Sequence, residues 1–275
     1  MIIARDIPEL RAALAGLPRP RALVATMGAL HAGHMALVAE ARRLAPGGVV
    51  ASIFVNPLQF GPREDFSRYP RLEADDLAML RAARCDVAWL PSVPTMYPPG
   101  AATRITVAGP AEGFEGAVRP GHFEGVATVV AKLLNQTAPD VTLFGEKDWQ
   151  QVQVVTRLAA DLDIPTQILP VPTIRDPDGL ALSSRNRHLT PGERARAPRL
   201  YAVLQAAAAR LAEGQPVSEA EHEGIAALQA SGFEPDYLRL ADATTLRPLD
   251  ALQRPARLLA AARLGTVRLL DNIAA

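Results

Sequence analysis

Short β-branched runs that alternate with helix-period segments constrain the fold of this chain more than any other feature. The alternation fills the first 170 of 275 residues and is typical of βαβ units with a parallel sheet. The run 49–55 is apolar nearly throughout, as expected for a central strand that helices cover on both faces. We expect strands at 22–25, 49–55, 86–90, 141–144 and 166–171, and helices at 35–44, 74–83, 123–135 and 149–162.

The pattern changes beyond Pro172. A polar loop over 175–186 precedes an Ala-rich segment that predicts one long helix from Pro191 to Glu213. Ser218 and Glu221 have the spacing of a capping box and predict the start of another helix. Strands are expected around 235–240, 257–262 and 266–270. The chain should therefore divide into a larger α/β domain, 1–173, and a smaller α+β domain, 174–275.

Composition excludes several classes of protein. The 29 basic and 29 acidic residues balance, which argues against a nucleic-acid partner. The single cysteine, Cys85, excludes an internal disulfide framework, fits a reducing compartment and is expected to be a buried filler. No apolar run reaches 18 residues and no signal-peptide pattern is present, so we expect a cytoplasmic protein without a membrane partner.

A segment rich in glycine and histidine, residues 26–34, joins the first predicted strand to the first long helix. Ligands of open parallel sheets bind at such strand ends, and the following helix offers free N–H groups to an anion. Gly28 and Gly33 allow the backbone to approach a phosphate, while His31 and His34 project to the same side of a helical turn. The alternatives are two surface histidines or a zinc pair, although zinc needs a third ligand and usually H-x-x-x-H spacing.

A second strand-to-helix junction, residues 144–151, contains Gly145, Lys147 and Gln151. Lys147 offers a compact cation to phosphate or carboxylate oxygens, and Gln151 lies one helical turn beyond it. The alternative is a solvated turn that caps a helix. Only Lys132 and Lys147 are lysines, against 27 arginines, so a bias toward arginine that spared Lys147 favours function there. Lys132 receives no role.

Further polar residues follow other predicted strands or open loops. The loop 182–186 combines two hydroxyls with a guanidinium, which is anion-binding chemistry. Gln59 can both donate and accept, and Arg119 precedes a helix where it could contact an anion. Asp75 and Asp76 could approach Mg²⁺ through water, although a solvated acidic pair in a first helical turn explains them equally well.

Taken in order, seven segments resemble the pantoate–β-alanine ligase family: TMGALHAGH, SIFVNPLQF, YPR, RPGHF, FGEKDWQQ, DGLALSSRN and RLLDN. Residues 31–34 also resemble the HxGH signature of the nucleotidyltransferase superfamily. The resemblance runs nearly the whole chain and departs at Ala25, where the family usually has proline. It implies a Rossmann-like, doubly wound parallel sheet, with the smaller domain acting as a lid.

The resemblance also implies an activity, which is ATP-dependent condensation of (R)-pantoate with β-alanine through a pantoyl adenylate, with Mg²⁺, in a homodimer. The implied catalytic residues are His31, His34, Lys147, Ser183, Ser184 and Arg185, with His34 as proton donor. The implied ATP-binding residues are Met27, Gly28, Ala29, Leu30, His31, Ala32, Gly33, His34, Gly145, Glu146, Lys147, Asp148, Ile174, Leu182, Ser183, Ser184 and Arg185. The implied substrate-binding residues are Gln59, Gln151, Asn56, Arg119 and His122.

Two other functions fit parts of the sequence. Another member of the superfamily would move AMP onto a phosphate or charge a tRNA, but the balanced charge and the lack of an anticodon-sized domain argue against tRNA. A catalytically silent nucleotide-binding regulator would keep the glycine loop. It would not need Gln59, Gln151, Lys147 and the loop 182–186 together.

Overall fold

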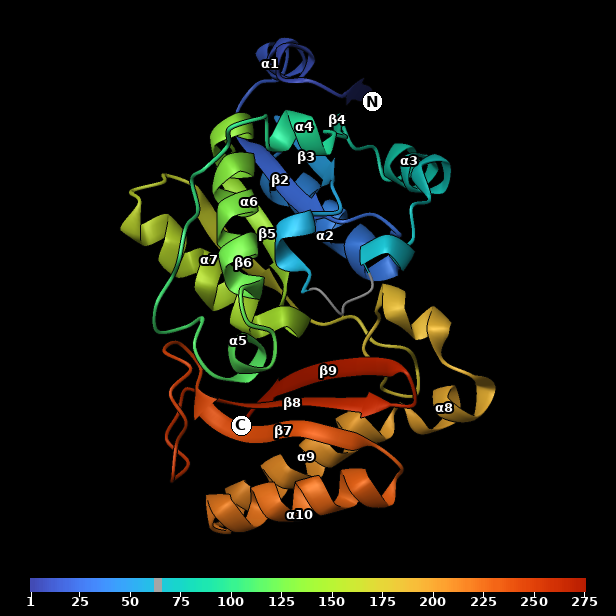
Figure 1. Ribbon diagram of the computed structural model, residues 1–275, viewed down its shortest axis with the longest axis vertical. Coiled ribbons are helices and arrows are strands. Elements are labelled where there is room, and N and C mark those ends of the chain that lie inside the picture. The colour runs from blue at the N-terminus through green and yellow to red at the C-terminus, as the bar shows by residue number, and fades with distance from the viewer. Residues whose placement is uncertain (62–65) are drawn as a thin grey trace. The chain divides into compact units, whose positions relative to one another are not determined.

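The computed structural model describes residues 1–61 and 66–275, and these residues form two compact units (Figure 1). Unit 1 comprises Met1–Gly145 and Val154–Val171, and unit 2 comprises Glu146–Gln153 and Pro172–Ala275. The sequence predicted a single boundary after residue 173. The structure instead groups the short segment Glu146–Gln153 with the C-terminal residues.

Unit 1 is built on a six-stranded, entirely parallel sheet in the order β1-β4-β3-β2-β5-β6. The order reverses between β2 and β5, and doubly wound sheets bind ligands at the carboxyl ends of the strands at such a point. The predicted fold class and all five predicted strands are therefore confirmed, and β1 is added at one edge. The strands are β1 (Ile2–Ala4), β2 (Arg21–Thr26), β3 (Gly48–Ile53), β4 (Val87–Trp89), β5 (Val141–Gly145) and β6 (Gln167–Val171).

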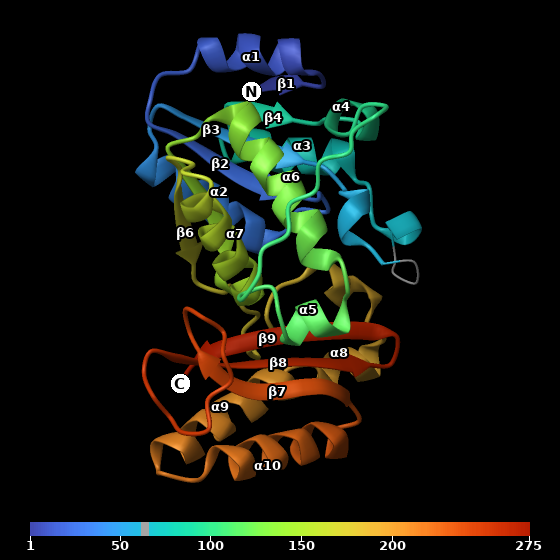
Figure 2. The ribbon, with the colours of Figure 1, turned by 60° about the vertical axis from the view of Figure 1, so that its left-hand side comes forward.

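Successive residues of a strand point to opposite faces of the sheet, and helices cover both faces of this one. Ala88 belongs to the core that α2 and α3 cover, whereas its neighbour Trp89 donates from Nε1 to Oε1 of Gln136 on α6 at 3.1 Å. Figure 2 shows α6 crossing the strands. The α-helices that begin in unit 1 are α1 (Ile7–Ala15), α2 (Ala32–Leu44), α3 (Glu73–Ala82), α4 (Val93–Met96), α5 (Phe114–Val118) and α6 (His122–Thr137), and α7 (Trp149–Asp161) begins in unit 2 and ends in unit 1.

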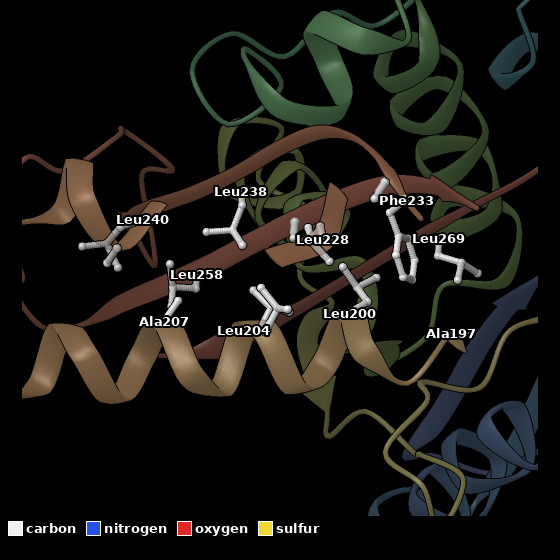
Figure 3. Packing of buried hydrophobic residues seen from close by; sticks show 14 of the residues in the cluster. Ala197, Leu200, Leu204, Ala207, Leu228, Phe233, Leu238, Leu240, Leu258 and Leu269 are labelled. Atoms are coloured by element: carbon white, nitrogen blue, oxygen red, sulfur yellow. The ribbon is translucent and has the colours of Figure 1, made fainter. Parts of the chain in front are cut away.

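Unit 2 packs helices on one face of an antiparallel sheet with the order β7-β8-β9. Side chains from α9, α10 and the sheet interdigitate in its core, as Leu204, Leu228, Leu238 and Leu258 show (Figure 3). This is the smaller α+β arrangement that the sequence predicted. Its elements are α8 (Pro191–Arg196), α9 (Arg199–Ala212), α10 (Val217–Ala230), β7 (Glu234–Asp242), β8 (Ala256–Leu264) and β9 (Val267–Ala274).

In unit 2, one helix prediction was wrong, and a second helix is present without its predicted cap. The single helix over 191–213 is two helices, α8 and α9, because Pro198 has no N–H to continue the ladder of α8. The capping box of Ser218 and Glu221 does not form, since α10 begins at Val217 without a side-chain cap. Glu221 is instead buried and accepts the N–H of Leu240 on β7 at 2.8 Å.

Cys85 is a buried packing residue, as predicted. Its Sγ lies 3.3 Å from the carbonyl oxygens of Val49 and Val87, and burial raises the pKa of the thiol to about 11. The group therefore stays a thiol near neutral pH. None of the helices within the described residues is long and apolar enough to cross a membrane.

Candidate active site

The loop between β2 and α2 is held in place by a buried carboxylate. Asp76 of α3 is only 2% exposed and accepts the N–H groups of Ala29 at 2.9 Å and Leu30 at 2.7 Å. Gly28 has a positive φ of 82°, and a Cβ on it would lie 2.9 Å from Oδ2 of Asp76. The glycine thus lets the loop press against the carboxylate that anchors it.

Asp75 and Asp76, for which the sequence allowed either a magnesium pair or a solvated acidic pair, lie in different surroundings. Asp75 is exposed, whereas both oxygens of Asp76 bind backbone N–H groups in the interior. Over residues 1–61 and 66–275, no group of three or more His, Cys, Asp or Glu side chains forms a metal site. We assign Asp76 to the loop rather than to Mg²⁺, and we derive no catalytic step through a protein-bound metal.

His31 and His34 together cap the N-terminus of α2. Nδ1 of His31 accepts the N–H of Gly33 at 3.1 Å, and Nδ1 of His34 accepts the N–H of His31 at 3.3 Å. The two ring centroids are 4.1 Å apart. The prediction that the histidines lie on one side of a helical turn is confirmed, and the helix begins at Ala32 rather than at the predicted residue 35.

This capping fixes the tautomer of both rings. A nitrogen that accepts an N–H carries no proton, so a neutral imidazole bound in this way has its proton on Nε2. Each histidine therefore carries an Nε2–H donor at the positive end of the helix dipole. An N–H donor of this kind suits an anionic oxygen.

The carboxyl end of β3 leads into the 3₁₀ helix η1 (Pro57–Gln59), where Asn56 orients the side chain of Gln59. Asn56 is 1% exposed, and its Nδ2 donates to Oε1 of Gln59 at 3.1 Å and to the carbonyl oxygen of Gly125 at 3.0 Å. Its Oδ1 accepts the hydroxyl of Tyr97 at 2.8 Å. Asn56 thus positions Gln59, and its own contact with substrate stays a prediction.

Arg119 and His122 also hold Gln59, through its backbone. Nδ1 of His122 lies 2.9 Å from the carbonyl oxygen of Gln59, and Arg119 donates to the same oxygen at 3.3 Å. Arg119 also lies 3.0 Å from Nε2 of His122. Since guanidinium N–H groups only donate, His122 accepts at Nε2 and donates from Nδ1. A Cβ on Gly125 would lie 2.3 Å from the carbonyl oxygen of Leu58, so α6 needs this glycine to reach η1.

These bonds determine how the Gln59 amide is oriented. Oδ1 of Asn56 also accepts the backbone N–H of Leu58 at 3.3 Å, and a backbone N–H can only donate. Asn56 must then turn its N–H groups toward Oε1 of Gln59. The Nε2 group of Gln59 consequently points away, with Sδ of Met27 at 3.0 Å. Gln59 thus offers N–H donors, which suit an oxygen acceptor.

In unit 2, Lys147 lies in the 3₁₀ helix η3 (Glu146–Asp148), which precedes α7. Its ammonium is 3.5 Å from Oδ1 of Asp148, and the side chain is 19% exposed. The carboxylate of Glu146 instead pairs with Arg257 of β8 at 2.9 Å. Gln151 is half-buried in the first turn of α7, one turn beyond Lys147 as predicted.

The loop with Ser183, Ser184 and Arg185 begins as a short hairpin, in which Leu182 donates its N–H to the carbonyl oxygen of Ile174 at 2.9 Å. Ser183 then caps the 3₁₀ helix η4 (Ser184–His188) by accepting the N–H of Arg185. Lys147, Ser183 and Arg185 line one small cavity of about 30 Å³. Unit 2 therefore brings together three of the predicted catalytic residues.

Sequence reasoning missed four residues that support the site: Asp76 in its loop role, Tyr97, Arg257 and Asn272. Only the RLLDN segment, which contains Asn272, carried any signal, and it was a resemblance without a role. The other three act through contacts with residues remote in the chain. Lys132 lies half-buried on α6 and still has no role.

Comparison with known proteins extends over the whole chain. Residues 2–274 match the family described as pantoate-beta-alanine ligase. The pantothenate synthetase of Acidiphilium cryptum (strain JF-5) is 59% identical over 278 residues, which cover 100% of both chains. That of Rhizorhabdus wittichii is 55% identical and covers 100% of this chain and 98% of its own.

Solved structures agree with this result. Pantothenate synthetase from Thermus thermophilus superposes with a TM-score of 0.94 at 48% identity, covering 100% of this chain and 99% of that one. Pantoate-beta-alanine ligase from Francisella tularensis, complexed with beta-gamma ATP and beta-alanine, has a TM-score of 0.84 at 35% identity and covers 100% and 97%. On both sequence and structure, this chain belongs to the pantoate–β-alanine ligase family.

Proposed function

We propose that this chain condenses (R)-pantoate with β-alanine at the expense of ATP, forming pantothenate through a pantoyl adenylate and releasing AMP and pyrophosphate. The observation that carries the proposal is its likeness, over the full chain, to the Francisella tularensis ligase complexed with beta-gamma ATP and beta-alanine. A carboxylate resists attack by an amine, so it must first become a mixed anhydride with AMP. The enzyme must also keep that anhydride from water.

In the first step, a carboxylate oxygen of pantoate attacks the α-phosphorus of ATP, and the bond to pyrophosphate breaks. His31 and His34 steady the phosphates through their Nε2–H groups, with His34 as the proton donor. Lys147, together with Ser183, Ser184 and Arg185, neutralises the charge that develops as pyrophosphate leaves. Mg²⁺ enters as the counter-ion of ATP, as part of the substrate.

In the second step, the neutral amine of β-alanine attacks the acyl carbon, a C–N bond forms, the nitrogen releases one proton, and AMP leaves with the former carboxylate oxygen. Gln59 and Gln151 hold pantoate, and Asn56, Arg119 and His122 act through Gln59. The N–H groups of Gln59 suit a carboxylate or hydroxyl oxygen of pantoate. ATP binds along residues 27–34, 145–148 and 182–185, with a backbone contact from Ile174 to adenine. We further propose a homodimer in the cytoplasm, without nucleic-acid or membrane partners.

One assay tests the function by measuring which substrate each release step requires. Pyrophosphate release from ATP should require pantoate, and AMP release should then require β-alanine. Pyrophosphate release that depends on an acceptor phosphate instead would indicate another nucleotidyltransferase. ATP binding without any pyrophosphate release would indicate a silent regulator and would refute the proposal.

Tyr97→Phe should raise the KM for pantoate while leaving kcat within about twofold. Phenylalanine keeps the ring beside Phe54 but removes the O–H that fixes the orientation of the Asn56 amide. Loss of one hydrogen bond, about 0.5–1.5 kcal/mol, corresponds to about a 2- to 12-fold rise in KM. Steady-state kinetics with pantoate and ATP varied separately measure the effect.

Tyr237→Phe, the same change on β7, is the matched control and should alter neither KM. An equal rise in the KM of ATP for Tyr97→Phe would contradict a role confined to Gln59. An unchanged KM for pantoate would show that the orientation of the Asn56 amide does not matter for binding.

A further inference from the structure

Strand β9 carries two adjacent buried polar residues, Asp271 and Asn272, in the segment RLLDN. Each is 4% exposed, and neighbouring residues of a strand point to opposite faces of the sheet. Asp271 is paired with Ala260, which belongs to the core that α9 and α10 form with the sheet. Asn272 is paired with Leu259 and points to the other face. Strand β9 contacts both η3 and η4, which carry Lys147 and the Ser183–Arg185 loop.

Asn272 holds the turn that contains Lys147. Its Nδ2 donates to two successive carbonyl oxygens, that of Glu146 at 2.9 Å and that of Lys147 at 2.8 Å. Both N–H bonds of the amide are thereby used on the backbone of η3. This amide therefore ties the backbone of Lys147 directly to strand β9.

Arg257 fixes the orientation of Asn272. It donates to Oδ1 of Asn272 and to the carboxylate of Glu146, and its guanidinium lies 3.7 Å from the centroid of the Trp149 ring. With Oδ1 bound to a guanidinium, the amide can only present its N–H groups to the turn. The planar group that holds Asn272 is thus itself held by a stacked ring.

Asp271 holds the other segment. It receives two bonds from Arg175, to Oδ2 at 2.5 Å and to Oδ1 at 2.9 Å. Arg175 stacks 3.7 Å from the centroid of Tyr201 and donates to the carbonyl oxygen of Gly179. Arg175 belongs to the hairpin that leads into Ser183, so this buried pair anchors the start of the serine–arginine loop.

We propose that Asp271 and Asn272 are positioning residues that hold Lys147 and the Ser183–Arg185 loop at a fixed separation for the pyrophosphate end of a nucleoside triphosphate. Both segments border the same cavity of about 30 Å³, and Asp271 is part of its wall. Two anchors from adjacent residues of one strand allow little relative movement of the cationic groups. The inference rests on the proposed function, because it assigns these groups to the departure of pyrophosphate.

Asn272→Asp is the main test. Aspartate has the same shape and keeps an acceptor for Arg257, but it replaces both donors with an oxygen that repels the carbonyl groups of Glu146 and Lys147. Displacement of a catalytic group by about 1 Å costs about 10²-fold, so we expect pantoate-dependent pyrophosphate release in a single turnover to fall about 10- to 100-fold. Attack of β-alanine on chemically supplied pantoyl adenylate should change less than about threefold, because no pyrophosphate leaves in that step.

A double-mutant cycle separates positioning from general loss of structure. In a Lys147→Ala background, Asn272→Asp should change the remaining rate less than about threefold, because the residue through which it acts is gone. Glu221→Gln is the structural control, since it weakens a buried contact to β7 in the same unit without touching either segment. It should lower the melting temperature and leave both half-reactions unchanged. Asn272→Ser, which introduces no buried charge, replaces Asn272→Asp if that variant does not fold.

The outcomes distinguish this inference from the function on which it rests. An equal loss in both half-reactions, or additive effects in the double-mutant cycle, would overturn the positioning role. So would an unchanged first half-reaction in a folded Asn272 variant. Absence of pantoate-dependent pyrophosphate release in the unmodified protein would overturn the proposed function instead.

Discussion

Lys147→Ala should lower the rate of pantoate-dependent pyrophosphate release by about 10²–10³-fold, the usual cost of removing one group that stabilises developing charge. Lys147 borders the same cavity as Ser183 and Arg185 in unit 2, and Asn272 holds the backbone from which its side chain extends. Alanine removes the charge and leaves that backbone bond in place. Single-turnover release of labelled pyrophosphate measures the effect, and a cooperative thermal transition verifies that the variant folds.

Lys147→Arg separates charge from shape. Arginine keeps the positive charge but replaces a compact ammonium with a planar fork, which does not fit a site built for a point-like cation. We expect severe impairment. The chain supplies its own control, because Lys132→Arg makes the same substitution at the only other lysine, on α6, and should leave activity unchanged. Near-normal turnover of a folded Lys147 variant would remove this residue from the catalytic set.

The alternation of β-branched runs with helix-period segments predicted the parallel sheet, because strands buried on both faces leave short, nearly continuous apolar runs in the local sequence. The same local reasoning failed where the tertiary structure uses a residue for something else. Glu221 has the spacing of a capping residue, but the N–H of Leu240 binds its carboxylate instead. Strand β1, Ile2–Ala4 at the edge of the sheet, was not predicted.

The candidate site also has some features that local sequence predicts and others that depend on tertiary contacts. The sequence predicted which polar segments follow the strand ends, and the structure places His31, Gln59 and Lys147 in three such segments. It could not predict which polar side chains contact one another, such as the amide of Asn56 with Gln59 and Gly125. Spacing indicates that residues share a turn, but hydrogen-bond direction depends on partners from distant elements.

The magnesium hypothesis shows this limit most clearly. Adjacent acidic residues at a helix start are equally consistent with a cation site and with a solvated first turn. The structure gives Asp76 a third use, in which its carboxylate accepts two backbone N–H groups from a loop 46 and 47 residues away. No pattern within the helix sequence records such a partner.

Asp76→Ala should destabilise the fold strongly and also impair catalysis. The substitution leaves the N–H groups of Ala29 and Leu30 buried without their acceptor, at about 1–3 kcal/mol each, so the free energy of unfolding should fall by about 2–6 kcal/mol. The loop that this carboxylate anchors leads directly into His31. Chemical denaturation measures the stability loss, and single-turnover pyrophosphate release measures the catalytic loss under conditions where the variant is folded.

Asp76→Asn and Asp75→Asn distinguish the loop role from a metal role. Asparagine at 76 keeps one acceptor oxygen and should give an intermediate loss of stability, whereas Asp75 is exposed and its replacement should leave stability unchanged. A metal ligand would behave differently, because its loss would raise the Mg²⁺ concentration needed for half-maximal activity. We expect that concentration to stay the same in both asparagine variants, since Mg²⁺ arrives bound to ATP. A raised Mg²⁺ requirement with unchanged stability in Asp76→Asn would overturn the loop assignment and return this carboxylate to the metal.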